Sequence, residues 1–275
     1  MAGIYAPSRT ITEISDCYFY HTIDLPGYGV VKGEWDLRTG VDSYLGHIPL
    51  TGKRVLEIGT ANGFLCFEME KRGAEVVAYD LSENDEWDIV PYGGKPSDPI
   101  LQERKTLIRK INHAWWLTHR LLNSKARVVY GSVYNLPKEI GPVDITTFGS
   151  VLLHLRDPFL SLQKAADLTR ETLVVTEAVP VFHRSKILSV VRSAARLNQR
   201  ISTFLIPSLN FLPNPDLGEP WDTWWNLSPE LVSRFLKILG FSKLNVSYHN
   251  QIHHYGKQLE HSRSRQMFTI IGQRN

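Results

Sequence analysis

The sequence predicts an α/β fold in which a mostly parallel β-sheet carries helices on both faces and ends in an antiparallel hairpin. Three observations favour this fold. Five short apolar runs rich in β-branched residues alternate with helix-like stretches, one strand-to-helix turn is rich in small residues, and two longer extended runs lie near the C-terminal end. We therefore expect strands buried between two layers of helices.

The expected parallel strands are short and apolar, as strands covered on both faces usually are. They span residues 54–58, 75–79, 127–130, 143–148 and 172–176. Two longer extended runs, at 242–249 and 266–272, are joined by a polar loop. These runs predict the terminal hairpin.

Capping residues mark where helices begin and end between these strands. Gly73 is a typical C-cap residue, and Asp157 and Ser228 each precede a proline, which is the N-cap and first-position pattern of a helix start. The helices expected from these signals span 64–72, 159–168 and 229–239.

Three segments fall outside a minimal sheet-and-helix core. Residues 1–50 are rich in aromatic side chains, residues 83–126 insert a polar loop and a basic helix with tryptophans, and residues 179–227 insert a second basic helix followed by PWDTWW. Insertions at the carboxyl ends of strands form lids and substrate walls in open α/β sheets. We therefore expect an N-terminal lid and substrate segment over 1–50 and a catalytic domain with two insertions over 51–275.

Composition excludes several classes of protein. The 275 residues are 43% hydrophobic and 21% charged, with a net charge of +3, which is typical of a globular chain and too mild to indicate nucleic-acid binding unless the basic residues cluster. The two cysteines lack CxxC spacing, so we expect neither a disulfide nor a metal site. No apolar run approaches the ~20 residues of a membrane span, and we expect a cytoplasmic protein without integral membrane association.

The basic segment 184–204 has apolar residues at helical spacing. Such a helix docks on a membrane surface, a partner or an acidic acceptor, or it packs on the core with a solvated basic side.

The strongest local motif is the turn after the first expected strand. Gly59, Ala61 and Gly63 are small enough for a ligand to approach the backbone, and a helix follows at once. The spacing differs from the G-x-G-x-x-G of pyrophosphate sites, and Glu57 would repel a phosphate but suit an ammonium group. Asp80 ends the second strand, where a carboxylate can accept both hydroxyl groups of a ribose.

These features resemble the class I S-adenosylmethionine-dependent methyltransferases over about residues 51–275. The motifs that carry the resemblance are VLEIGTANG, AYDLS and TTFGSVLLH, together with the terminal hairpin. The resemblance implies a Rossmann-like class I methyltransferase sheet of seven strands and S-adenosyl-L-methionine as cofactor, with a dinucleotide as the alternative ligand. The predicted cofactor-binding residues are Glu57, Gly59, Thr60, Ala61, Asn62, Gly63, Asp80, Leu81, Ser132, Val133 and Gly149.

Methyl transfer requires alignment of donor and acceptor, and a general base only when the acceptor is a weak acid such as a hydroxyl. His154 follows the fourth strand and is the predicted base, because its unperturbed pKa suits proton removal near neutral pH; the alternative is a structural residue in a turn. The predicted acceptor-binding residues are Trp35, Arg38, Arg156, Glu177, Trp221, Trp224 and Trp225. Structural alternatives remain open for these residues. Arg156 could pair with Asp157, Glu177 could bind a lid arginine, and the tryptophans could simply pack within the lid.

Within the superfamily, the run that begins at SVLLHLRDPF looks like the group that contains the bacterial tRNA wobble-uridine carboxymethyl transferases. That group has carboxylate-binding residues at the positions of Leu153 and Thr223, which cannot bind a carboxylate well, so the ordinary methyl donor is favoured. Our first hypothesis is O-methylation of a small polar acceptor such as a sugar or secondary metabolite. The second is methylation of RNA, because basic residues surround the first inserted helix, and the third is a non-catalytic S-adenosylmethionine-binding interaction protein. The oligomeric state is open.

Overall fold

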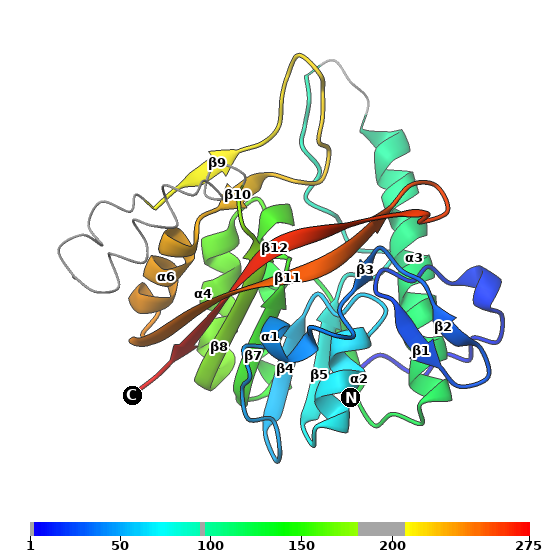
Figure 1. Ribbon diagram of the computed structural model, residues 1–275, viewed down its shortest axis with the longest axis horizontal. Coiled ribbons are helices and arrows are strands. Elements are labelled where there is room, and N and C mark those ends of the chain that lie inside the picture. Colours follow the sequence, from blue (N-terminus) through cyan, green and yellow to red (C-terminus); the bar gives the residue numbers. More distant parts are fainter. Residues whose placement is uncertain (1–2, 94–96, 181–206) are drawn as a thin grey trace.

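A computed structural model describes residues 3–93, 97–180 and 207–275. At its centre lies one eight-stranded sheet of order β3-β11-β12-β8-β7-β4-β5-β6 (Figure 1). The strands are β3 (Trp35–Asp36), β4 (Arg54–Ile58), β5 (Glu75–Asp80), β6 (Arg127–Tyr130), β7 (Val143–Gly149), β8 (Thr169–Ala178), β11 (Lys243–Tyr255) and β12 (His261–Gln273).

The pairing of these strands confirms the predicted sheet. β4 pairs in parallel with β5 and β7, and these pair in parallel with β6 and β8. β12 then adds antiparallel to β8, and β11 antiparallel to β12. The chain thus builds outward from β4 first on one side and then on the other, which creates a topological switch point beside the carboxyl end of β4.

Two features of the sheet differ from the expectation. The eighth strand, β3, comes from the N-terminal segment and pairs with Ile252 and His253 of β11; two residues are too few to produce a strand pattern in the sequence. The polar stretch between the two hairpin runs was expected as a loop, but most of it is strand, and β11 and β12 remain in register from Lys243 with Gln273 to Tyr255 with His261. Beyond the core, most residues of this arm are polar and exposed, with Gln251 buried and His253 and His254 partly buried, so the arm lacks the alternation of hydrophobicity that marks a half-buried strand.

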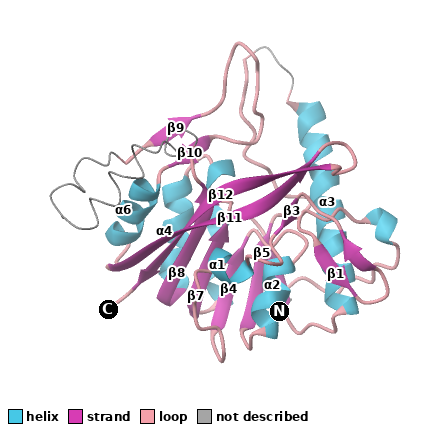
Figure 2. Cartoon of the chain, viewed as in Figure 1, coloured by secondary structure: helices cyan, strands magenta, loops and turns pink. Residues whose placement is uncertain are grey.

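Helices cover both faces of the sheet (Figure 2). On one face lie α1 (Val41–Tyr44), α2 (Phe64–Lys71) and α3 (Asp98–Leu121), and on the other lie α4 (Pro158–Leu168) and α6 (Pro229–Ile238). Val55 packs on the first side and Leu56 on the second, because successive strand residues point to opposite faces. The predicted caps are present: Asp157 accepts the Leu160 N–H and Ser228 accepts the Leu231 N–H.

Shorter elements complete the described chain. Two small antiparallel sheets join β1 (Ile23–Leu25) with β2 (Gly29–Val31) and β9 (Leu209–Phe211) with β10 (Trp225–Leu227). The 3₁₀ turns are η1 (Ile14–Asp16), η2 (Val133–Asn135), η3 (Lys138–Ile140) and η4 (Leu152–His154). The N-terminal segment therefore contributes β1, β2, β3 and α1, and the first insertion contributes α3.

The second insertion contributes β9 and β10, and its basic segment 184–204 lies outside the described residues. Among the residues that the structure describes, no helix is both long enough and apolar enough to cross a membrane.

Candidate functional site

The loop between β4 and α2 has a backbone that requires small residues. Gly59 and Gly63 have φ angles of +78° and +85°, and Ala61 between them also has a positive φ of 49°. A Cβ atom on Gly59 would lie 2.4 Å from the Val151 side chain, which follows β7. Glycine at position 59 therefore permits both the left-handed backbone and the close approach of the neighbouring loop.

Asp80 holds this loop from the end of β5. Its Oδ2 accepts the Ala61 N–H at 2.8 Å, and its Oδ1 accepts the Leu81 N–H at 2.8 Å. Burial raises the pKa of Asp80 to about 6, although the two backbone bonds favour the ionised form. Each carboxylate oxygen has a further lone pair, so Asp80 can still accept hydrogen bonds from a ligand hydroxyl.

Glu57 lies beside this loop and is the second-last residue of β4. Its side chain is buried, and neither carboxylate oxygen has a hydrogen-bond partner among the described residues. Burial raises the pKa of Glu57 to about 8; the nearby Thr60 hydroxyl and Cys66 N–H act to lower this pKa, and the charge of Asp80 acts to raise it. A buried carboxyl group without a partner is costly, so this position favours a ligand that brings a cation or donors to it.

The other predicted cofactor-binding residues differ in whether their side chains already have hydrogen-bond partners within the protein. The Thr60 hydroxyl is buried without a partner, and the Ser132 hydroxyl accepts the Tyr134 N–H. The Asn62 side chain is bound elsewhere: its Oδ1 accepts the His21 N–H at 2.7 Å, and its Nδ2 donates to the His21 carbonyl at 3.1 Å. Asn62 thus joins the N-terminal segment to the loop, and only its backbone remains for the predicted cofactor contact.

His154 lies in η4, directly after β7, and is partly buried. Its Nδ1 lies 2.5 Å from the backbone carbonyl oxygen of Asp222. A carbonyl oxygen only accepts, so Nδ1 carries the hydrogen and the neutral ring has its lone pair on Nε2. The Trp87 ring meets the imidazole edge to face at 6.3 Å. This arrangement is consistent with the predicted general base.

Glu177 lies within β8 and is buried. Its Oε1 accepts the Leu152 N–H at 2.8 Å, and burial raises its pKa to about 8. The carboxyl group therefore anchors the start of η4, two residues before His154. Glu177 is a predicted acceptor-binding residue, and the contact to Leu152 gives it an anchoring role as well.

The tryptophans of the second insertion make hydrogen bonds to neighbouring loops. The Trp224 indole donates to the Asp88 carbonyl at 2.8 Å, and the Trp225 indole donates to the Leu155 carbonyl at 3.0 Å. The Trp221 ring packs edge to face on Tyr92 at 5.2 Å. All three tryptophans therefore make contacts within the lid, as the alternative of lid packing describes.

Arg156 is exposed, and its guanidinium lies over the Trp224 ring at 5.2 Å. Its backbone N–H, at 2.7 Å from Asp88 Oδ2, ties the loop after η4 to the first insertion.

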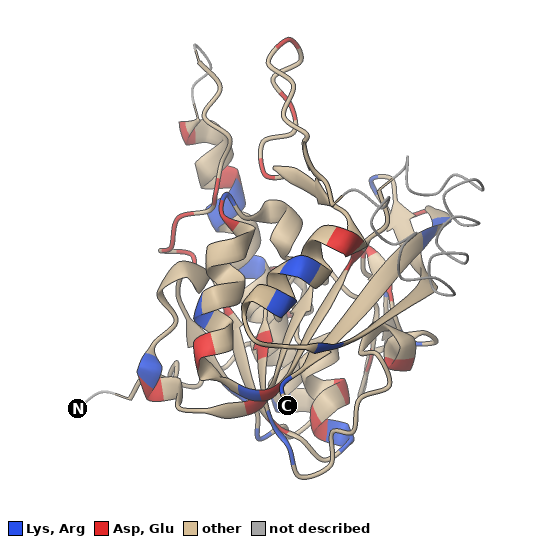
Figure 3. Cartoon of the chain, turned by 90° about the vertical axis from the view of Figure 1, so that its left-hand side faces the viewer, with Lys and Arg blue, Asp and Glu red and all other residues tan. Residues whose placement is uncertain are grey.

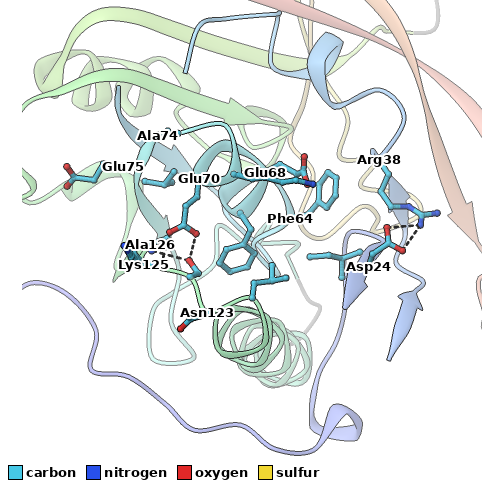
Figure 4. Close-up of a pocket in the computed structure, with 17 residues that line it drawn as sticks. Asp24, Arg38, Phe64, Glu68, Glu70, Ala74, Glu75, Asn123, Lys125 and Ala126 are labelled. Carbon is cyan, nitrogen blue, oxygen red and sulfur yellow. Dashed lines mark hydrogen bonds and ion pairs between the residues drawn. The ribbon is translucent and has the colours of Figure 1, made fainter. Parts of the chain in front are cut away.

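Trp35 and Arg38, the two predicted acceptor-binding residues of the N-terminal segment, make contacts in different parts of the molecule. Trp35, in β3, packs edge to face on His253 at 4.7 Å. Arg38 pairs with Asp24 and Asp36 and lines a cavity of about 980 Å³ beside α2 and the C-terminal end of α3 (Figure 4). Neither Glu57 nor Asp80 lines this cavity, so the structure does not bring Arg38 together with the donor loop.

Four polar residues lie around His154 and Glu177. Two of them, Asp222 and Tyr44, carry no local sequence signal of a site role, whereas Tyr20 belongs to the aromatic candidates of residues 1–50 and Arg104 to the basic residues around the first inserted helix. Burial and then the charge of Glu34 raise the pKa of the Tyr20 hydroxyl, a side-chain hydrogen bond with Trp35 lowers it, and the charges of Glu177 and Asp222 raise it by smaller amounts. Arg104 of α3 pairs with Asp222 at 2.9 Å. The fourth, Tyr44, places its hydroxyl 3.3 Å from the Ser150 hydroxyl. Their partners lie far apart in the sequence, and the signal available there was the density of aromatic residues in 1–50.

No family model matches the chain, and no curated protein matches it. Among solved structures, the N-terminal domain of EvdMO1, crystallised in the presence of SAH and D-fucose, is similar with a TM-score of 0.52 and 15% identity over 92% of this chain and 90% of that chain. The fold is that of the class I methyltransferases. Magnesium protoporphyrin IX methyltransferase (ChlM) from Synechocystis PCC 6803, with bound SAH, is similar with a TM-score of 0.49 and 14% identity over 86% of this chain and 83% of that chain.

Proposed function

We propose that this protein transfers the methyl group of S-adenosyl-L-methionine to a hydroxyl group of a small polar acceptor, such as a sugar or a secondary metabolite. One observation carries the proposal: two carboxyl groups, the buried Glu57 and the partly buried Asp80, flank a glycine loop at the switch point of the sheet. This is the place where open α/β sheets bind their ligands.

The residues present fit this donor better than they fit a dinucleotide. Both Glu57 oxygens lack a partner, which suits the ammonium group of the methionine part and would repel a pyrophosphate. Asp80 retains lone pairs for the two ribose hydroxyls after it has accepted the Ala61 and Leu81 N–H groups. Leu81, Ser132 and Val133 follow the ends of β5 and β6, on the adenine side of the proposed site.

His154 is the proposed general base. When bound, S-adenosyl-L-methionine supplies an electrophilic methyl group, so the chain itself has to align the acceptor, exclude water and remove one proton. The free Nε2 lone pair of His154 would take the hydroxyl proton, while the Nδ1–H remains on the Asp222 carbonyl. The buried Glu177 keeps η4 in place during this step.

A sugar is the first acceptor class to test. The structurally similar domain of EvdMO1 was crystallised with D-fucose present. In this chain the Trp87 ring and the Asp222 backbone carbonyl contact His154, and the charges of Asp222 and Glu177 act on the buried Tyr20 hydroxyl. Aromatic rings and carboxyl groups of this kind bind the faces and hydroxyls of polyols.

RNA is less well supported as the acceptor. Three of the basic residues that motivated this hypothesis make internal contacts: Arg104 pairs with Asp222, Arg120 donates to the Ile11 carbonyl, and Arg127 pairs with Glu75. In the view of Figure 3, Lys and Arg positions are interspersed with Asp and Glu positions. Binding of RNA should weaken steeply with salt, whereas turnover of an uncharged small molecule should not.

The deciding experiment is titration calorimetry with S-adenosyl-L-methionine, SAH and NAD. We expect the wild type to bind the first two and not NAD. Asp80→Ala should weaken SAH binding by about 100-fold, because hydrogen bonds to a charged group are worth roughly 1.5–3 kcal/mol each. Asp216→Ala, at an exposed aspartate, is the matched control.

Two outcomes would change the proposal. Absence of donor binding by folded protein would overturn the proposed function. Donor binding without transfer of labelled methyl groups into sugar, glycan or RNA fractions would favour the interaction-protein hypothesis instead.

A further inference from the structure

Both contacts of the His154 ring depend on one residue of the first insertion. The Asp222 backbone carbonyl accepts the Nδ1–H, and the Trp87 ring packs edge to face on the imidazole. Arg104, in α3, pairs with the Asp222 carboxylate at 2.9 Å and also places its guanidinium 5.8 Å from the centre of the Trp87 ring. One guanidinium therefore contacts both groups that touch the ring.

The Arg104–Asp222 pair is shielded enough to be persistent. The side chain of Arg104 is 24% exposed and that of Asp222 is 20% exposed. Ion pairs that are largely removed from water are screened less by salt than fully exposed pairs. The pair restrains the Asp222 side chain, and the backbone carbonyl of the same residue accepts the hydrogen of His154 Nδ1.

We propose that Arg104 is a positioning residue that selects the Nδ1–H tautomer of His154 through Asp222 and Trp87. It leaves the Nε2 lone pair directed away from the Asp222 carbonyl and available to a hydroxyl acceptor. This inference rests on the proposed function only for the use made of Nε2. The tautomer and its dependence on Arg104 stand on geometry alone.

The loop that carries Asp222 is also held by its neighbours. The Trp221 carbonyl accepts the Val90 N–H at 2.8 Å, and the Trp224 N–H donates to the Leu153 carbonyl at 2.8 Å. Removal of the Arg104 charge should therefore leave the fold intact and release only the local orientation at Asp222. This makes the proposal testable in folded variants.

The test is nuclear magnetic resonance of the ¹⁵N-labelled histidine rings in the full chain without ligand. His154→Gln identifies the His154 signals by their loss. We expect the wild-type His154 to show a protonated Nδ1 and an unprotonated Nε2. In Arg104→Gln and in Asp222→Asn the two nitrogen shifts should move toward each other, as the tautomers begin to exchange. The double variant should change them no further than either single variant.

Two controls separate positioning from general structural damage. Arg109→Gln makes the same chemical change at an exposed arginine of the same helix and should leave the His154 signals unchanged. Arg104→Lys, which retains the charge beside Asp222, should restore most of the wild-type pattern.

A wild-type His154 with the hydrogen on Nε2, or unchanged His154 signals in both folded single variants, would overturn the proposal. Loss of SAH binding is measured separately by calorimetry, so a failure of the donor proposal remains distinguishable.

Discussion

The proposed donor half and the proposed acceptor half of this site are built in different ways. The donor half consists of one strand, loop and helix start, residues 57–63, held by Asp80 from the adjacent strand. The acceptor half gathers side chains from four distant segments, around Tyr20, Arg104, His154 and Asp222. The first half therefore follows from local sequence, whereas the second exists only once the N-terminal segment and both insertions have folded.

This difference predicts that the two halves respond to different kinds of substitution: the donor half to local backbone strain, and the acceptor half to the loss of contacts between distant segments. In the donor half, backbone conformation decides whether the loop can form, so substitutions at glycine should have the largest effects. In the acceptor half, hydrogen bonds between segments decide the arrangement, so single substitutions should loosen one contact at a time.

The largest expected effect is that of Gly59→Ala. The new Cβ would lie 2.4 Å from Val151 Cγ2, and the φ of +78° is strained for any residue with a side chain. We expect a loss of roughly 2–5 kcal/mol in unfolding free energy, from about 1–2 for the left-handed backbone and about 1–3 for overpacking. Chemical denaturation and SAH calorimetry measure stability and donor binding.

Val151→Ala in the same chain removes the clash but not the backbone strain. The double variant should therefore recover roughly 1–3 kcal/mol of the stability lost by Gly59→Ala. Equal stability of the single and double variants would show that Val151 does not restrict the donor loop, and the two halves of the site would then be mechanically independent.

Asn62→Ala tests whether the N-terminal segment is held by the donor loop. The substitution leaves the buried N–H and carbonyl of His21 without partners, which should cost roughly 2–4 kcal/mol. Amide hydrogen exchange should accelerate in residues 18–38 more than in residues 55–80. Asn245→Ala, at an exposed asparagine of β11, should change neither.

The same variant sharpens the comparison between the two halves. An SAH affinity lost as completely as in Asp80→Ala, with the protection of residues 18–38 intact, would assign Asn62 to the cofactor, as its place in the loop predicted from sequence. A modest loss of affinity that follows the loosening of the N-terminal segment would assign it to the link between the halves.

The helix ends and strand ends were predictable because their signals are contiguous. Gly73, Asp157 and Ser228 marked helix ends, and Glu57 and Asp80 lie at the ends of β4 and β5 as the sequence predicted, where their contact with the cofactor stays a prediction. Each of these signals acts within a few residues along the chain, so sequence alone carries it.

The acceptor half was only partly predictable. His154 and the tryptophans were identified as candidates, but the partner that fixes the His154 ring lies 68 positions away. The same holds for β3, which pairs with β11 more than two hundred residues later, and for the Asn62 contact to His21. Such contacts depend on how the insertions pack, and no local periodicity records them.

A pH dependence of donor binding tests the electrostatics of Glu57. In the free protein its pKa is about 8, so the carboxyl group is mostly protonated at pH 7. A bound ammonium group favours the ionised form of Glu57, so ligand binding should release a proton. The affinity for SAH should therefore increase as the pH is raised toward 8. Between pH 6.5 and 7.5, where an α-amino group stays largely protonated, we expect up to about a tenfold gain.

Glu57→Gln isolates this contribution from the other buried carboxyl groups. The variant should bind SAH more weakly at pH 7.5 and lose most of the pH dependence, as followed by calorimetry in buffers with different ionisation enthalpies. Adenosine, which lacks the ammonium group, should bind the wild type without the proton release. A pH dependence that survives in Glu57→Gln would transfer the effect to another group, with Asp80 the next candidate because its pKa is about 6.

The smallest expected effect is that of Arg38→Gln, and it tests the boundary of the acceptor half. Arg38 pairs with Asp24 and Asp36 beside α2, and its side chain is 31% exposed, so the loss of stability should stay below about 1 kcal/mol. SAH affinity and methyl transfer into sugar fractions should remain at wild-type levels. Arg156→Gln is the matched comparison, because this arginine packs on Trp224 in the loop next to His154. If Arg38→Gln abolished transfer while Arg156→Gln did not, the acceptor would have to reach the cavity beside α2, and the division of the molecule into a donor half and an acceptor half around His154 would be wrong.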